Sequence, residues 1–293
     1  MTYVVGIDGG GTSCRVAIGD ETGRILAQAQ SGPANIRTDL EGAHANIVAA
    51  TTTAAERANL SMDVLGTAAA VLGLAGGNVG RHAAVLRSML PFRESRVVSD
   101  GLIALHGALG PHDGVIAILG TGSVFFVRRQ GTVRSVGGWG FQVGDLASGA
   151  RIGRQLLEET LLAFDGVRPG SPLTDRVMET FDGDPRRIVD QVRDATPGFY
   201  GSFAPSIVEA ASAGDGVAED ILEAGRRDIE RMLAVIVAPD TDRICLLGGL
   251  APTYAARLSD TYLQRLKPPI GDALQGAVAM AAAGAASSAG STT

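Results

Sequence analysis

The chain has 293 residues, 45% of them hydrophobic and 19% charged, which is ordinary for a globular protein of one or two domains. Its formal net charge is −6 and its charges form no block of one sign, which argues against a nucleic-acid partner. No apolar run reaches the ~18 residues of a membrane span, and two cysteines build no disulfide framework, so we expect a cytoplasmic protein without a membrane partner.

The first part of the chain alternates predicted strands with predicted helices. The opening strand follows Met1 almost at once and carries no Lys or Arg, which argues against a secretory signal. A helix rich in Ala is expected over 39–60, with Asp39 as its N-cap, and further helices are expected over 80–90 and 101–109. Short apolar runs predict strands at 3–7, 14–18, 24–27, 71–74 and 96–99.

The same order of elements restarts near residue 114. A strand, a glycine turn with Thr, a second strand, a turn at Gln130-Gly131 and a third strand repeat the opening pattern. Later, Ser171-Pro172 and Asp184-Pro185 are typical helix starts, because Pro is tolerated in the first helical turn. The alternation of strands and helices favours an α/β fold. These strands are expected at 115–119, 124–129, 132–136 and 242–247, and the helices at 151–164, 216–238 and 272–285.

Two glycine-rich turns, each after an apolar strand, carry the strongest functional signal. The first reads Asp8-Gly9-Gly10-Gly11-Thr12 and the second Leu119-Gly120-Thr121-Gly122-Ser123. Glycine lets backbone N–H groups approach an anion, and Thr or Ser adds a hydroxyl donor. One such turn is often a plain hairpin, but two predict a pair of lobes that grip one polyphosphate. The sequence lacks both the P-loop and the G-x-G-x-x-G dinucleotide signature.

Two carboxylates at expected strand ends extend this signal. Asp8 lies in the first turn and can order Mg²⁺ through water, as a hard oxygen ligand. Asp100 follows the strand 96–99, at the edge where α/β sheets place their ligands. A lone Asp at this position is often only a helix N-cap. Beside two phosphate-binding turns, it is also a candidate general base for a hydroxyl that attacks a γ-phosphate.

The motifs together resemble those of a known superfamily. The two turns, Ser99-Asp100-Gly101 and Gly248-Gly249 are similar to the phosphate-1, phosphate-2, connect-1 and adenosine motifs of the actin/hexokinase/chaperone ATPases. Within that superfamily the chain resembles, over about residues 3–285, the BadF/BadG/BcrA/BcrD group and its hexosamine kinases. Further similar stretches are 6–15, 31–36, 165–169 and 200–205.

The resemblance implies a fold and a reaction. The fold is α/β, with two actin-like (ribonuclease H-like) lobes over 1–110 and 111–293 and an ATP cleft between them. The last helix can pack back across the hinge. The reaction is transfer of the ATP γ-phosphate to the 6-hydroxyl of glucosamine, which gives glucosamine 6-phosphate and ADP, with N-acetylglucosamine as the alternative acceptor. The partners are then a small amino sugar and MgATP. The oligomeric state is left open, with a homodimer as one alternative.

The resemblance also implies roles for single residues. Asp100 is the catalytic base and Asp8 the Mg²⁺ ligand. ATP and its phosphates are bound by Gly10, Gly11, Thr12, Gly120, Thr121, Gly122, Gly248 and Gly249. The sugar is bound by Asn35, Gly76, Gly77, Ser123, Gly138 and Asp145.

Several of these sugar-side assignments have alternatives. Asn35 can be a plain turn residue, and Trp139, beside the expected sugar loop, can simply pack in a core. The related kinases usually place Glu or Gln after the Gly-Asp pair of this loop, whereas this chain has Leu146. Leu146 makes no polar contact, so the departure leaves the specificity for the sugar open.

Three functions of other classes remain to be compared. An activating ATPase of the same group carries cysteines for an iron–sulfur cluster, and Cys14 with Cys245 do not match that arrangement. A sugar-sensing repressor needs a helix-turn-helix segment, which the sequence before residue 3 does not provide. A polymerising or chaperone-like ATPase needs further subdomains, for which the chain is short.

Overall fold

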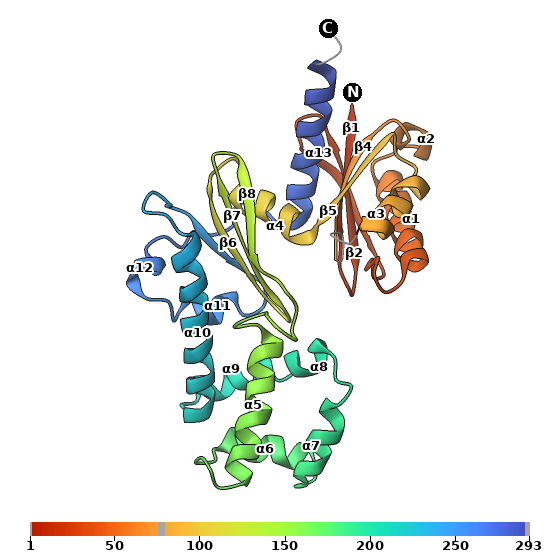
Figure 1. The fold of residues 1–293 in the computed structure, drawn as a ribbon. Helices are drawn as coiled ribbons and strands as arrows, with labels where there is room; N and C mark the ends of the chain where they lie inside the picture. The colour runs from red at the N-terminus through yellow and green to blue at the C-terminus, as the bar shows by residue number, and fades with distance from the viewer. Residues whose placement is uncertain (1, 76–79, 291–293) are drawn as a thin grey trace. The chain divides into compact units, whose positions relative to one another are not determined.

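The computed structural model describes residues 2–75 and 80–290, which divide into two units (Figure 1). One unit comprises Met1–His112 together with Pro269–Thr293, and the other comprises Asp113–Pro268. The sequence placed the boundary near residue 110, close to the observed one. It assigned the end of the chain to the second lobe, with a last helix able to pack back across the hinge, and residues from Pro269 onward belong to the first unit.

The first unit contains a five-stranded sheet in the order β3-β2-β1-β4-β5. Its first three strands, all predicted from the sequence, form an antiparallel meander, and the last two run parallel to β1. Residues alternate between the two faces, so Val5 and Ile7 enter one core while Val4 enters another. The strands are β1 (Tyr3–Gly9), β2 (Cys14–Asp20), β3 (Ile25–Ser31), β4 (Ala69–Leu74) and β5 (Glu94–Ser99).

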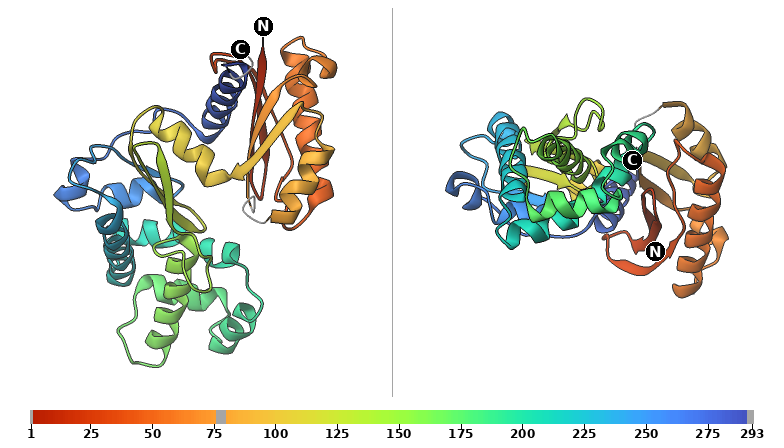
Figure 2. Two further views of the ribbon diagram at one scale, coloured as in Figure 1. Left: turned by 45° about the horizontal axis from the view of Figure 1, so that its top comes forward. Right: turned by 90° about the horizontal axis from the view of Figure 1, so that it is seen from below.

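Helices cover both faces of this sheet (Figures 1 and 2). The helices α1 (Leu40–Arg57), α2 (Met62–Leu65) and α3 (Gly80–Met89) lie on one side, and Asp39 caps α1 as expected. The other side carries α4 (Asp100–Leu109) and the last helix, α13 (Ala273–Gly290).

The last helix joins the first unit because glycines let it approach closely. A Cβ atom on Gly6 of β1 would lie 2.6 Å from Val278, and one on Gly276 would lie 2.0 Å from the carbonyl oxygen of Ile103 in α4. Val278 is fully buried in this contact. The burial of this apolar helix face is the physical reason that the end of the chain departs from the predicted second lobe.

The second unit contains a four-stranded sheet in the order β8-β7-β6-β9. Its first three strands are an antiparallel meander and β9 runs parallel to β6, which repeats the arrangement of β1, β2, β3 and β4. The internal repeat predicted from the sequence is therefore confirmed. The strands are β6 (Gly114–Leu119), β7 (Ser123–Arg129), β8 (Thr132–Gly137) and β9 (Ile244–Leu247).

Eight helices complete the described part of the second unit. Ser171 and Asp184 cap the helices that follow them, as predicted, through backbone N–H groups of Thr174 and Arg186. Four short helices, α8, α9, α11 and α12, were not predicted. The eight are α5 (Gly149–Phe164), α6 (Pro172–Thr180), α7 (Pro185–Val192), α8 (Pro197–Gly201), α9 (Ala204–Ser212), α10 (Gly216–Ile236), α11 (Ala251–Ala255) and α12 (Asp260–Leu263).

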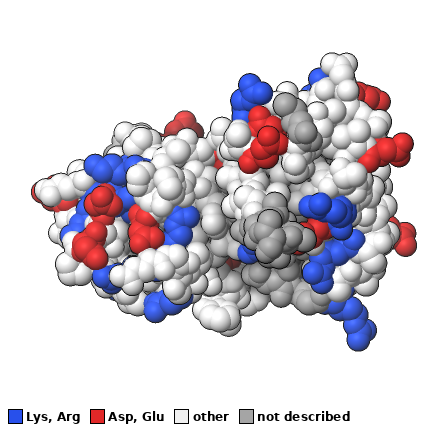
Figure 3. Space-filling model, turned by 90° about the horizontal axis from the view of Figure 1, so that it is seen from above, with Lys and Arg blue, Asp and Glu red and all other residues white. Residues whose placement is uncertain are grey.

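The charges on the surface are mixed in sign. On the face that Figure 3 shows, Lys and Arg side chains occur beside Asp and Glu side chains. Within the ranges 2–75 and 80–290, no helix is long and apolar enough to cross a membrane.

Candidate active site

The carboxyl ends of three parallel strands meet at one edge of the first sheet. Gly9 of β1 pairs with Leu74 of β4, and Leu74 pairs with Ser99 of β5, so the three strands end at the same level. Asp8 therefore lies on β1 at this edge, and Asp100, the first residue of α4, lies beyond β5. The structure thus brings the two predicted carboxylates to the edge where α/β sheets bind ligands.

Asp100 is not needed as the cap of its helix. That role belongs to Ser99, whose Oγ accepts a hydrogen bond from the Leu102 N–H group at 3.2 Å. The Asp100 carboxylate accepts instead from the Gly101 N–H group at 2.8 Å. Although the side chain reaches solvent, surrounding protein removes enough hydration to raise the pKa of Asp100, and the charge of Asp8 raises it further. The Gly101 donor opposes both effects.

Asp8 is held by an arginine on the neighbouring strand. Arg15 donates to Asp8 Oδ2 from Nη2 at 2.6 Å and from Nε at 3.3 Å. No group of three or more His, Cys, Asp or Glu residues that could hold a metal ion occurs in the described part of the chain. One carboxylate fits a hydrated Mg²⁺ that is held mainly by water and phosphate oxygens, and does not fit a closed metal site.

The first glycine turn lies directly beside the loop that carries Asn35. The Ala34 N–H group donates to the Gly10 carbonyl oxygen at 2.9 Å. Asn35 Oδ1 accepts from the Arg37 N–H group at 3.0 Å, so this side chain does shape a turn, while its amide nitrogen has no hydrogen-bond partner among the described residues. Thr12, in the first glycine turn, is exposed. The expected sugar contacts Gly76 and Gly77 lie outside the described residues.

The second glycine turn supports the start of α5. The Gly149 N–H group donates to the Gly120 carbonyl oxygen at 2.7 Å, and the Ala150 N–H group donates to the Thr121 carbonyl oxygen at 3.1 Å. Gly248, at the end of β9, has a φ of +92°, and a Cβ atom there would lie 2.5 Å from the Leu119 carbonyl oxygen. The fold itself therefore requires glycine at position 248.

Other motif glycines are not required by the fold. A Cβ atom on Gly11, Gly120 or Gly249 would meet no atom within 4 Å, and none of the three has a positive φ. The missing side chains thus leave open space beside the backbone of both turns and of the Gly248-Gly249 pair. This space suits a ligand that approaches the backbone closely.

A cavity of about 620 Å³ extends from the second turn within the second unit. Its size falls in the range of small-molecule sites, and several glycines give it walls of bare backbone. The stretch 200–205, noted in the sequence for its resemblance, supplies part of the lining, whereas Val208 and Glu209 of α9 belong to no motif. The lining residues are Gly120, Thr121, Gly149, Gly201, Ala204, Pro205, Val208, Glu209, Gly249, Leu250 and Thr253.

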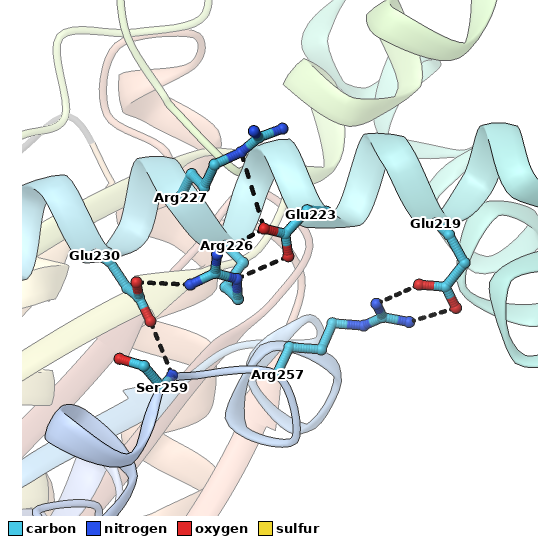
Figure 4. Close-up of polar contacts among 7 residues, drawn as sticks. All are labelled: Glu219, Glu223, Arg226, Arg227, Glu230, Arg257 and Ser259. Atoms are coloured by element: carbon cyan, nitrogen blue, oxygen red, sulfur yellow. Dashed lines mark hydrogen bonds and ion pairs between the residues drawn. The ribbon is translucent and has the colours of Figure 1, made fainter.

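The segment that follows α11 is held on α10 by ion pairs and a backbone hydrogen bond (Figure 4). Arg257, which follows α11, binds Glu219 through two hydrogen bonds of 2.6 and 3.0 Å. Glu230 accepts from the Ser259 N–H group at 2.8 Å, and Arg226 holds Glu230 at 2.6 Å. These contacts fix the segment that carries Leu250 and Thr253 against a long, well-packed helix.

The loop that precedes α5 carries Asp145 beside the second turn. Burial raises the pKa of Asp145, and hydrogen bonds from the backbone of Ser123 and Gly140 oppose this rise. The Ser123 hydroxyl donates to the Leu146 carbonyl oxygen at 2.7 Å, so it holds the loop. Gly138 lies in the same loop with a φ of +71°. Trp139 is 80% exposed, so it does not pack in a core.

Each of the two sheets carries a glycine turn after its first strand. Residues 5–281, which include both turns, match the BadF/BadG/BcrA/BcrD ATPase family. The chain belongs to this family. Over 283 residues, which are 96% of each chain, this family member is 38% identical to the glucosamine kinase GspK of Vibrio cholerae.

Solved structures of other proteins have a similar fold. That of a candidate N-acetylglucosamine kinase from Chromobacterium violaceum matches with a TM-score of 0.85 and 31% identity, over 96% of this chain and 99% of that one. A ROK family glucokinase from Streptomyces griseus shares the fold at a TM-score of 0.55 and 18% identity, over 95% and 98% of the two chains. The resemblance and the α/β fold class inferred from the sequence are both confirmed.

Proposed function

We propose that this family member is an ATP-dependent glucosamine kinase. It transfers the γ-phosphate of ATP to the 6-hydroxyl of glucosamine and releases glucosamine 6-phosphate and ADP. The observation that carries the proposal is the 38% identity to the Vibrio glucosamine kinase over 96% of both chains. The two open glycine turns and the carboxylates at the sheet edge supply groups that this chemistry needs.

In this proposal Asp100 is the general base. Its carboxylate accepts the proton of the 6-hydroxyl while the sugar oxygen bonds to the γ-phosphorus and the bond to the ADP oxygen breaks. The raised pKa makes Asp100 a stronger proton acceptor than an ordinary carboxylate. Its hydrogen bond from Gly101 fixes the direction of the carboxylate at the start of α4.

We assign the nucleotide to the turns and the cavity, where glycines leave the backbone accessible. The adenosine part is placed in the cavity of about 620 Å³ beside Gly249, and the phosphates are placed on the turn at Gly120 and Thr121. Residues 10–12 of the first unit are also assigned to phosphate binding. Mg²⁺ neutralises phosphate charge when bound, and Asp8 holds its water ligands. A change in either turn is therefore expected to raise the KM for ATP.

The choice of glucosamine depends on Asp145. The amine of glucosamine is charged near neutral pH, and the Asp145 carboxylate is the proposed partner for it. A pocket built for an ammonium group disfavours the neutral amide of N-acetylglucosamine, because the carboxylate then stays unpaired. N-acetylglucosamine is the alternative acceptor, since the exposed ring of Trp139 and the side chain of Leu146 offer apolar surface for an acetyl group.

The acceptor is tested by kcat/KM for both sugars at pH 7 and pH 9, with Asp145→Asn as the matched variant. Asn tolerates the positive φ of +52° at this position, so the loop is expected to persist. Glucosamine should be preferred at pH 7, and its advantage should shrink at pH 9 and in the variant. A preference for N-acetylglucosamine at both pH values would make N-acetylglucosamine the acceptor in place of glucosamine, and the proposed kinase activity would still stand.

A further inference from the structure

Arg15 links the expected metal ligand to a distant part of the chain. It lies on β2 directly opposite Asp8 of β1 in the antiparallel register. Its Nε and Nη2 groups both donate to Asp8 Oδ2, and its Nη1 group donates to Asp272 Oδ2 at 2.7 Å. One guanidinium therefore holds two carboxylates, and Asp272 lies 257 positions from Arg15 in the chain.

Asp272 is itself rigidly placed. Its Oδ1 accepts from the Gln275 N–H group at 2.9 Å, while Gln275 Oε1 accepts from the Asp272 N–H group at 2.9 Å. This reciprocal pair caps the start of α13. The Asp272 carbonyl oxygen packs so tightly on α4 that a Cβ atom on Gly107 would lie 1.9 Å from it. Asp272 is thus a fixed support for the arginine.

The contacts of Arg15 make the two oxygens of Asp8 unequal. Both N–H donors go to Oδ2, and Oδ1 has no hydrogen-bond partner within residues 2–75 and 80–290. The planar guanidinium sets this arrangement in a way that a lysine cannot, because Lys has a single nitrogen at the end of a flexible chain. The cluster of Asp8, Arg15 and Asp272 contains two carboxylates and one guanidinium, so its net negative charge still attracts a cation.

We propose that Arg15 is a positioning residue for the metal–nucleotide complex: it engages Asp8 Oδ2, leaves Oδ1 for the water shell of Mg²⁺, and is held in this pose by Asp272. The inference rests on the proposed function, because it assumes that Mg²⁺-nucleotide binds beside Asp8. Asp272 supplies no contact to the nucleotide. Its negative charge keeps Arg15 from cancelling the charge that Asp8 offers to the cation.

The test is calorimetric titration of ADP into the full chain, once with Mg²⁺ and once with a chelator. The variants are Arg15→Lys and Asp272→Asn, since an Asn oxygen still accepts from Gln275 and preserves the helix cap. Arg24→Lys is the control, because Arg24 pairs with Asp20 at the opposite end of β2. Thermal unfolding of each variant reports whether the fold is kept.

In the wild type, Mg²⁺ should tighten ADP binding. In both test variants, the factor by which Mg²⁺ increases the affinity for ADP should fall about 10- to 100-fold, which is the usual effect of removing a group that orients a metal ligand. Their metal-free ADP affinity should stay unchanged, and the control should behave as the wild type. An equal loss of metal-free ADP affinity would mean that Arg15 contacts the nucleotide directly, and would overturn the inference.

Two further outcomes would also overturn it. If the variants keep the full effect of Mg²⁺, Asp8 is oriented without Arg15. If the wild type shows no effect of Mg²⁺ on ADP, Asp8 has no part in metal binding. The proposed function fails separately, when no hexosamine is phosphorylated in a direct assay, whatever the calorimetry shows.

Discussion

Replacement of Asp100 by Asn removes the proposed base and little else. In the Asp100→Asn variant, the amide oxygen of the new side chain can still accept from the Gly101 N–H group, which lies 2.8 Å from the native carboxylate. The cap of α4 also stays in place, because Ser99 provides it. The variant is therefore expected to fold as the wild type does and to bind both substrates.

The expected loss of kcat follows from the role of a positioned base. Such a group contributes about 100- to 10,000-fold, which corresponds to about 2.7 to 5.4 kcal/mol in the activation free energy. KM values for ATP and glucosamine should change little, because the variant keeps the shape of the site. The pH profile of the wild type should fall on the acid side at the raised pKa of Asp100, since only the carboxylate accepts a proton.

Stability gives an independent check of the same residue. A carboxyl group whose pKa is raised in the folded state contributes stability at low pH, and this contribution is lost as the pH rises through the folded-state value. At neutral pH the Asp100→Asn variant should therefore be at least as stable as the wild type. A coupled ADP-release assay and a thermal melt check both points. Retention of most of kcat, or a clearly lower Tm, would refute the reasoning.

Four other substitutions separate the residues that contact ligands from those that stabilise the fold. Gly11→Ala and Gly120→Ala should raise the KM for ATP while Tm stays constant, because an added Cβ atom meets no protein atom within 4 Å. Gly248→Ala should lower Tm in a thermal melt, because its φ is +92°. Glu219→Gln should cost about 0.2 to 1 kcal/mol in denaturant titrations by weakening the pair with Arg257. Since pairing with Arg257 lowers the Glu219 pKa from 4.5, this difference should be full above pH 4.5 and should disappear as the pH falls through the lowered pKa of the folded state.

The repeated sheet could be predicted because its signals are local. Each meander has short apolar strands, a glycine turn and a second turn within about thirty residues of sequence. Asp8 and Asp100 could be placed at one edge for the same reason, since parallel strands end together. The capping residues Ser171 and Asp184 were also visible, because their contacts reach only two or three positions ahead.

The residues that make contacts between distant segments of the chain could not be predicted from the sequence. The packing of α13 on the first sheet depends on the small residues Gly6 and Gly276, which carry no periodic signal of their own. The helices α8 and α9 line the cavity, yet five and nine residues are too few to show a reliable helical period. The pair between Arg15 and Asp272 spans 257 positions, so no local pattern reveals it.

The most direct test of the proposed kinase is identification of its product. The chain is incubated with MgATP and glucosamine, and the products are analysed by phosphorus and carbon NMR. The proposal predicts ADP and glucosamine 6-phosphate in equal amounts, with the phosphate on O6. Release of ADP that does not depend on the sugar, or a phosphate on any other oxygen, would contradict it.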